Sequence, residues 1–184
     1  MGVSQDGSRE FISLLACICA DGSKLPPALI YKVESHDLIS SWLSDFTEEH
    51  NAYFASSSNG WSSDELGLQW LERVFHRHTK DKVGNRRRLL IVDGHSSHVN
   101  MKFIKWADKH RIIITIMPPH STHRLQPLDV GLFQPLATAY SKEISKLMSE
   151  SYGLVSMTKH IFWRMFNSVT DHGYSSPIAI TVAR

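Results

Sequence analysis

The stretch Leu89-Leu90-Ile91-Val92-Asp93-Gly94-His95-Ser96-Ser97-His98 decides which fold is expected of the chain. An apolar run ends on a carboxylate and is followed by a glycine and a polar cluster that contains two histidines. An apolar run that is rich in branched residues and bounded by a turn signal predicts a buried strand. A strand that ends on an aspartate carries that side chain to a sheet edge, where functional sites are commonly built.

A second carboxylate, Asp129, closes the segment Leu125-Gln126-Pro127-Leu128-Asp129. Asp93 at a strand end and Asp129 at a helix start can converge on one sheet edge if a further strand lies between them. Paired aspartates are hard oxygen ligands that suit Mg²⁺ or Mn²⁺, and two such ions can promote phosphodiester cleavage. Taken singly, Asp93 also fits a turn residue and Asp129 a helix N-cap.

The composition is that of a soluble intracellular protein with one well-packed domain. Of the 184 residues, 42% are hydrophobic and 21% charged, which argues against general disorder. The net charge of +2 permits a nucleic-acid partner without demanding one. Cys17 and Cys19 cannot build a disulfide framework, and neither a membrane span nor a signal peptide is evident.

Hydrophobic periodicity predicts an α/β domain with a mixed sheet. The first strand is apolar on both faces, which predicts a central strand covered on both sides. The helix that follows the key strand should bury Phe103, Ile104 and Ala107. We expect strands at 11–20, 28–33, 52–55, 89–93 and 111–116, the first two as a hairpin, and helices at about 62–75, 100–110, 129–148 and 158–166.

Two further groups of side chains could carry chemistry. Residues 80–88 are expected to form a loop, whose arginines Arg86, Arg87 and Arg88 are equally consistent with phosphate contacts and with solvated surface. Two H-x-x-H pairs allow a zinc hypothesis. The same histidines, together with Arg124, would otherwise line the rim of the aspartate site and meet a phosphate there. The histidines of the two pairs are His95, His98, His120 and His123.

The motifs Asp93-Gly94-His95, Pro118-Pro119-His120 and Leu125-Gln126-Pro127-Leu128-Asp129 resemble the DDE superfamily endonuclease domain of pogo-type (mariner-like) transposases. The resemblance covers roughly residues 10–150. It implies an RNase H-like mixed sheet flanked by helices, a three-carboxylate site that binds two Mg²⁺ or Mn²⁺ ions, cleavage of DNA followed by strand transfer, and action in the nucleus. Asp93 matches the second carboxylate and Asp129 the third.

The chain also departs from that family pattern. The first carboxylate belongs on a strand upstream of residues 11–20, and the two early aspartates, Asp6 and Asp21, are expected in turns. The helix-turn-helix region that recognises transposon ends has no counterpart here. We therefore expect a DDE endonuclease domain at 1–150 that is truncated at its N-terminus and lacks its first strand, followed by a helical extension and loose tail at 151–184.

The predicted function is a transposon-derived domain that binds DNA, with Asp93 and Asp129 left as an incomplete catalytic and metal site. The alternatives are an active Mg²⁺-dependent endonuclease or transposase and a zinc-dependent hydrolase. The expected partner is DNA, no membrane is involved, and a homodimer is allowed. The predicted nucleic-acid contacts are His95, His98, His123, Arg124, Arg86 and Arg87.

Overall fold

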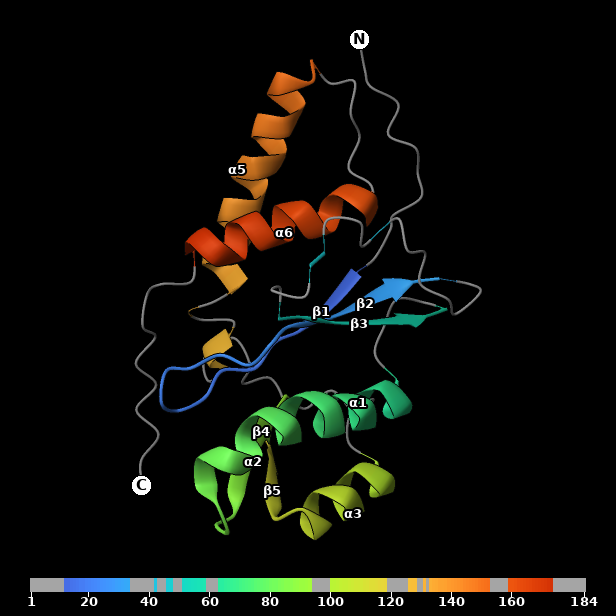
Figure 1. Ribbon diagram of the computed structural model, residues 1–184, viewed down its shortest axis with the longest axis vertical. Coiled ribbons are helices and arrows are strands. Elements are labelled where there is room, and N and C mark those ends of the chain that lie inside the picture. The colour runs from blue at the N-terminus through green and yellow to red at the C-terminus, as the bar shows by residue number, and fades with distance from the viewer. Residues whose placement is uncertain are drawn as a thin grey trace.

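The protein is an α/β structure with one three-stranded and one two-stranded sheet (Figure 1). The computed structural model describes residues 12–33, 42, 46–47, 51–58, 63–93, 100–118, 126–128, 131, 133–152 and 159–173. The elements within these residues are β1 (Ile12–Leu15), β2 (Ala28–Lys32), β3 (Tyr53–Ser57), α1 (Asp64–Trp70), the π-helical segment η2 (Leu71–His76), α2 (Arg77–Val83), β4 (Arg88–Val92), α3 (Met101–Lys109), β5 (Ile112–Ile116), α5 (Gln134–Glu150) and α6 (Lys159–Gly173).

The three-stranded sheet contains the predicted hairpin. β1 pairs antiparallel with β2, from Ile12 opposite Tyr31 to Leu15 opposite Ala28, and β2 pairs parallel with β3. The hairpin turn contains Gly22 at φ +82°, a backbone conformation that glycine adopts without steric cost. β1 is shorter than expected, because regular pairing stops at Leu15 and only an isolated bridge joins Ile18 to Lys24.

The helices before and after β4 begin at side-chain caps. The Ser63 hydroxyl accepts a hydrogen bond from the Leu66 backbone amide at 3.3 Å, the usual role of a serine that directly precedes a helix. α1, η2 and α2 then follow one another as a continuous helical stretch up to Val83. The Asn100 side chain in turn accepts from the Phe103 amide at 2.9 Å at the start of α3.

β4 and β5 form a parallel pair connected through α3, as the strand–helix–strand pattern predicted. The register runs from Arg88 opposite Ile112 to Val92 opposite Ile116. Parallel strands need a crossover connection, and α3 supplies it. The carboxyl ends of both strands therefore lie at one edge.

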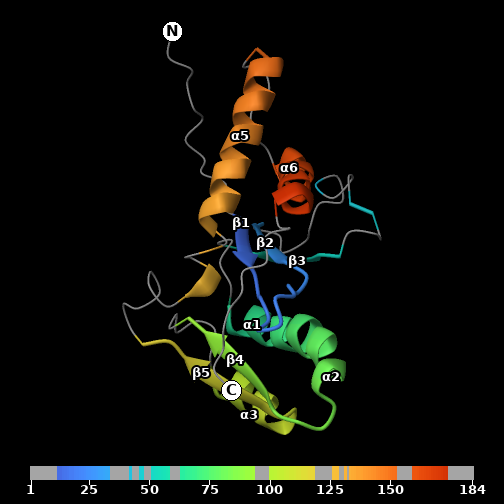
Figure 2. The same ribbon diagram turned by 90° about the vertical axis from the view of Figure 1, so that its left-hand side faces the viewer.

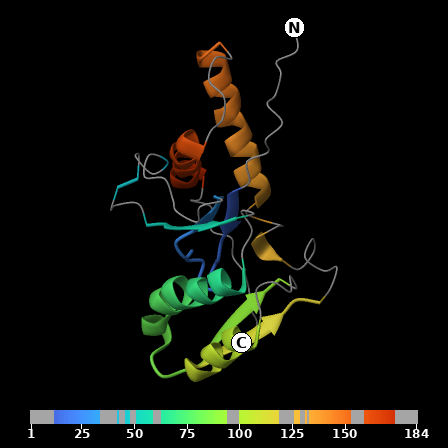
Figure 3. The same cartoon turned by 90° about the vertical axis from the view of Figure 1, so that its right-hand side faces the viewer.

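Helices pack against the three-stranded sheet from two sides. α5 and α6 lie on one side of it and α1 on the other, as Figures 2 and 3 show from opposite directions. On the first side, Trp163 and Phe166 of α6 are buried against Leu29 and Tyr31 of β2. The second core joins η2 to both sheets; its buried residues are Leu25, Leu71, Val74, Phe75, Leu90, Phe103, Ala107 and Ile112.

The expectation that the strand at residues 89–93 is buried is wrong for one of its faces, and the same face of β5 is exposed as well. Leu90 is only 4% exposed, whereas its neighbours Leu89 and Ile91 are 51% and 45% exposed, and Ile113 of β5 is 45% exposed. Within the described residues, η2 and α3 cover one face of this pair and no element covers the other. Ile104 of α3, also expected in the core, is 42% exposed because it lies off the face that packs on β5.

The expectation for the first strand needs a similar correction. All four residues of β1 are half-buried, so the strand is not covered on both sides. β2 has the burial that was expected of β1, since Leu29, Ile30 and Tyr31 are at most 1% exposed. The physical reason is position in the sheet. β2 lies between two strands, and β1 has a strand partner on only one side among the described residues.

Candidate functional site

Asp93 lies at the carboxyl end of β4, where the sequence predicted it. It follows Val92 directly and is half-buried. The Met117 backbone amide donates a hydrogen bond of 3.0 Å to the Val92 carbonyl oxygen, so the chain leaving β5 is fixed beside Asp93. The segment that leads on to Asp129 therefore departs from the same sheet edge. The Asp93 carboxylate forms no hydrogen bond or ion pair with another described residue.

The other predicted members of the site lie outside the described residues. These are Asp129, His95, His98, His120, His123 and Arg124. The convergence of Asp93 with Asp129 and the zinc alternative consequently both stay predictions. Within the part of the chain that the structure describes, no group of three or more His, Cys, Asp or Glu side chains is placed to hold a metal ion.

The donor chemistry at the edge can still be compared with the metal that the resemblance implies. Asp93 is a carboxylate at the end of a rigid strand, and a carboxylate is the hard oxygen donor that Mg²⁺ and Mn²⁺ take. Mg²⁺ commonly retains several waters and uses one or two carboxylates together with phosphate oxygens of the substrate. Asp93 fits such a ligand set, although one carboxylate by itself does not make a metal site.

Asp21 does not lie at the edge formed by Asp93. It belongs to the turn between β1 and β2, where its Oδ2 atom is 2.9 Å from the Lys82 ammonium at the end of α2. Its Oδ1 atom accepts hydrogen bonds from the Ser23 hydroxyl and amide. The bonds from Ser23, followed by the bond from Lys82, lower the pKa of the Asp21 carboxyl well below its usual range. Lys82 leads into the loop before β4, so Asp21 lies toward the start of that strand and Asp93 at its end.

Arg86 and Arg87, grouped by sequence with the histidine rim as nucleic-acid contacts, precede β4 at its other end. At about 3.3 Å per strand residue, the backbone of Arg87 is on the order of 20 Å from that of Asp93. Both side chains are exposed, and the Arg87 guanidinium is 3.6 Å from the Asp108 carboxylate. The structure does not bring these arginines to the Asp93 edge.

Arg88 differs from its two neighbours and overturns the expectation of a loop over residues 80–88. Helix α2 continues to Val83, and Arg88 is the first residue of β4, where it is only 7% exposed. Its guanidinium donates to the His110 carbonyl oxygen at 2.7 Å and to the Thr79 hydroxyl at 3.1 Å. Sequence reasoning missed this role because the partners come from two other elements. The one local signal is the position of Arg88 directly against the apolar run 89–92.

A family model described as DDE superfamily endonuclease matches residues 8–168, which is most of the chain. The chain belongs to the DDE superfamily endonuclease family. The resemblance inferred from the D-G-H and L-Q-P-L-D motifs is thereby confirmed. No solved structure gives a significant match.

Curated relatives of this DDE endonuclease chain include two kinds of protein. A protein of Cochliobolus lunatus named MFS-type transporter clz9 is 37% identical over 94% of this chain and 18% of its own length. The human Pogo transposable element with KRAB domain is 28% identical over 70% of this chain and 20% of its own length. Its mouse counterpart is 27% identical over 68% of this chain and 19% of its own length.

The DDE endonuclease chain thus spans about a fifth of the length of the curated relatives it matches. Despite the transporter name of the Cochliobolus protein, none of the helices among the described residues has the length and hydrophobicity needed to span a membrane.

Proposed function

We propose that this chain is a transposon-derived DDE endonuclease domain that binds DNA at the sheet edge formed by the ends of β4 and β5. The observation that carries the proposal is the position of Asp93. It follows a strand held in parallel register with β5, and the backbone of Met117, directly after β5, is hydrogen-bonded to Val92 beside it. Membership of the endonuclease family and the pogo relatives support a DNA substrate. A DNA substrate in turn suggests action in the nucleus.

We further propose that the two sheets are parts of one RNase H-like mixed sheet that lacks a strand between β1 and β4. Among the described residues, β1 pairs only with β2 and β4 only with β5. Both sheets nevertheless contribute to one core, in which Leu25 after the hairpin turn packs with Leu71 of η2 and Leu90 of β4. In the RNase H-like sheet that the family resemblance implies, a further strand between β1 and β4 would join the two sheets and would bring its own carboxylate to the Asp93 edge.

In this proposal Asp93 and Asp129 would hold Mg²⁺ or Mn²⁺. The bound metal would supply charge stabilisation at the scissile phosphodiester and a more acidic water. The Asp93 side chain itself contributes a fixed negative charge on a rigid strand end, which is how a positioned carboxylate selects a cation before DNA arrives. The strand, and not a loop, sets its position.

We infer that the 184-residue chain, tested by itself, binds DNA but cleaves it poorly or not at all. Two-metal phosphodiester cleavage depends on carboxylates from several elements converging within hydrogen-bonding or coordination distance. The partners of Asp21 support this inference. Asp21 is the only aspartate before Asp64 in the described part of the chain, and its carboxylate is already bonded to Lys82 and Ser23. The alternative is an active endonuclease.

The binding part is tested by titrating a fluorescent DNA duplex with the purified chain over a series of salt concentrations. Release of counterions predicts that the logarithm of the binding constant falls linearly with the logarithm of salt concentration, by about 0.9 for each phosphate contacted. Saturable binding with such a slope supports the proposal. Absence of saturable binding at low salt would reject it, provided that the circular dichroism of the same sample shows a folded protein.

A further inference from the structure

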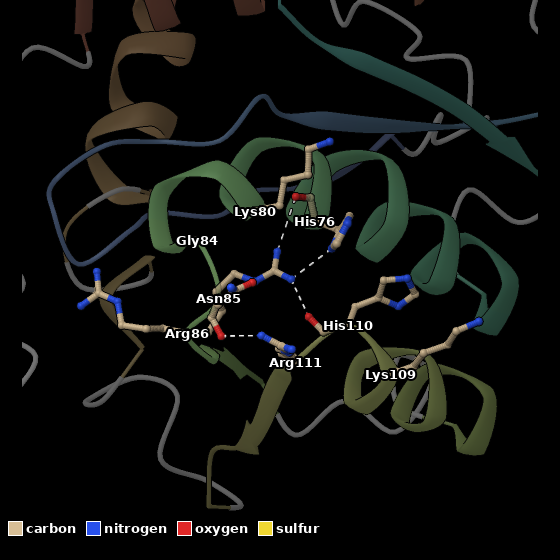
Figure 4. A pocket seen from close by; sticks show the side chains of 9 residues that line it. His76, Lys80, Gly84, Asn85, Arg86, Lys109, His110 and Arg111 are labelled. Atoms are coloured by element: carbon tan, nitrogen blue, oxygen red, sulfur yellow. Dashed lines mark hydrogen bonds between the residues drawn. The ribbon is translucent and has the colours of Figure 1, made fainter.

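A cavity of about 210 Å³ lies at the start of β4, at the opposite end of that strand from Asp93. Figure 4 shows its lining side chains, which come from η2, α2, the loop before β4, and the junction of α3 with β5. None of the nine lining residues is acidic. The Lys and Arg residues among them are Lys80, Arg86, Arg88, Lys109 and Arg111. This cavity is called the basic pocket below.

Arg88 forms the buried part of the basic pocket and carries a charge that no carboxylate of a described residue neutralises. Its guanidinium donates to the His110 carbonyl oxygen, the Thr79 hydroxyl and the Nδ1 atom of His76, all neutral acceptors. Its Nε atom is buried and has no hydrogen-bond partner among the described residues. A buried cation without a counter-charge is costly, and a bound anion would offset that cost.

Two histidines lie beside Arg88, and one of them, His76, has an N–H donor that is not used by the described hydrogen bonds. His76 must accept through Nδ1 at 3.1 Å, because a guanidinium can only donate, so its own proton is on Nε2. His110 donates from Nδ1 to the Trp106 carbonyl oxygen at 2.8 Å, and its ring stacks on the Trp106 indole with centroids 3.7 Å apart. The His76 and His110 rings meet edge to face, with their centroids 4.9 Å apart.

The nearby carboxylates do not neutralise the basic pocket. The Asp108 carboxylate of α3 lies 3.6 Å from the Arg87 guanidinium, and neither residue lines the pocket. Burial, and after it the positive charges of Arg88, His110 and Lys80, lower the pKa of His76. Asp81 raises that pKa, but its effect is the smallest of these. The lining of the pocket is therefore positively charged, which favours an anion over a metal cation as its ligand.

The size of the basic pocket restricts the anion. Pockets for drug-sized ligands usually exceed 300 Å³, so about 210 Å³ suits a single small group. Guanidinium, ammonium and imidazole donors arriving from several directions match the several acceptor oxygens of a phosphate.

We propose that the basic pocket is a phosphate-binding site. The phosphate is either a backbone phosphate of DNA held by this domain, which rests on the proposed function, or a free phosphate ion. The backbone of Arg88 is about 17 Å from that of Asp93 at 3.3 Å per strand residue. That span equals roughly five nucleotide steps of 3.4 Å along one DNA strand.

The direct test is to titrate the full 184-residue chain with inorganic phosphate and to monitor the imidazole signals of His76 and His110 in NMR spectra. These signals are assigned by comparison with His76→Gln and His110→Gln. The proposal predicts saturable shifts of both signals at constant pH and ionic strength. The same titration with chloride should leave them unmoved. Failure of phosphate to shift either signal would overturn the proposal.

A pair of matched variants separates the basic pocket from general surface charge. Lys80→Gln/Lys109→Gln removes two rim charges, and Lys102→Gln/Lys105→Gln removes two exposed charges outside the lining. Glutamine keeps the helix propensity of lysine nearly unchanged, so both variants should fold. We expect the first variant to weaken phosphate binding about tenfold and the second to leave it unchanged. Equal weakening by both variants would reject a specific site.

The same variants identify the source of the phosphate. If DNA occupies the basic pocket, Lys80→Gln/Lys109→Gln also lowers the salt dependence of duplex binding by about one to two contacts, and the control variant does not. If duplex binding is unchanged while phosphate binding weakens, the site binds free phosphate. If the unmodified protein binds phosphate but does not bind the duplex, the proposed function is rejected and the basic pocket is retained as a phosphate-binding site.

Discussion

The two ends of β4 carry polar residues of opposite charge that are held in opposite ways. At the start, Arg88 is 7% exposed and bonded to groups from η2, α2 and the α3–β5 junction. At the end, Asp93 is half-buried and bonded to none of the other described side chains. One strand therefore carries at its start a side chain that is bonded into the fold and at its end a side chain that makes no hydrogen bond or ion pair with the other described residues. Sequence alone assigned chemistry to both ends.

The largest effect is expected from Arg88→Met, which keeps the length of the side chain and removes its donors. The His110 carbonyl oxygen and the Thr79 hydroxyl lose their partner while buried, so the free energy of unfolding should fall by about 2–4 kcal/mol. Urea denaturation followed by circular dichroism measures it. The exposed neighbour supplies the control, because Arg87→Gln should change the same quantity by less than about 0.5 kcal/mol. Similar losses in both variants would erase the distinction between Arg88 and its neighbours.

Acidification should lower the free energy of unfolding through His76 and His78. Burial and the nearby cations lower the pKa of His76, and burial lowers the pKa of His78, whose ring is 3.0 Å from the Tyr53 hydroxyl. Both groups bind a proton more readily in the unfolded chain, so the stability that they contribute is present above about pH 6.5 and is lost as the pH falls below it.

The urea midpoint should therefore decrease from pH 7 to pH 5, and the decrease should be smaller in His76→Gln. A midpoint that rises over this range, or a decrease that His76→Gln leaves untouched, would contradict the assignment of His76 as a neutral acceptor for Arg88.

A smaller effect on stability, with a visible effect on assembly, is expected on the exposed face of β4 and β5. Leu89 and Ile113 lie opposite each other and are both about half exposed. Leu89→Thr/Ile113→Thr should change the free energy of unfolding by less than about 1 kcal/mol, since threonine favours strands and little burial is lost. An exposed apolar face favours self-association, so sedimentation velocity should show less dimer or aggregate in the variant. A strongly destabilised variant would mean that this face is covered in solution.

The smallest effect on stability is expected at the other end of the strand. Asp93→Asn should change the free energy of unfolding by less than about 0.5 kcal/mol, because the carboxylate bonds to no other described side chain. The same substitution should reduce Mn²⁺ binding at least tenfold, which the electron paramagnetic resonance signal of free Mn²⁺ reports. Unchanged Mn²⁺ binding would remove Asp93 from the metal site.

The elements were predictable from sequence where the signal is local. The hairpin, the cap at Ser63 and the strand–helix–strand order around α3 all follow from turn residues, capping side chains and periodicity. The burial of β4 and β5 was not predictable, because an isoleucine in a strand carries no information on whether a helix covers its face. The hydrogen bonds of Arg88 were not predictable either, because its partners Thr79 and His110 belong to other elements of the fold.

The candidate site was likewise predictable from the sequence only in part. The motif predicted Asp93 at a strand end, and the structure places it there. The division of the chain at residue 150 and the partnership of Asp93 with Asp129 stay predictions. The basic pocket is built from residues that are far apart in sequence, such as His76 and His110, and no pattern in the chain links them.

The most direct test of the central claim is the nicking of supercoiled plasmid DNA by the 184-residue chain in the presence of Mn²⁺, with Asp93→Asn assayed beside it. The proposal predicts salt-dependent binding of the plasmid by both proteins and no nicking by either above the background of the buffer. Nicking by the unmodified chain that disappears in Asp93→Asn would contradict it and would show that this chain assembles a complete endonuclease site.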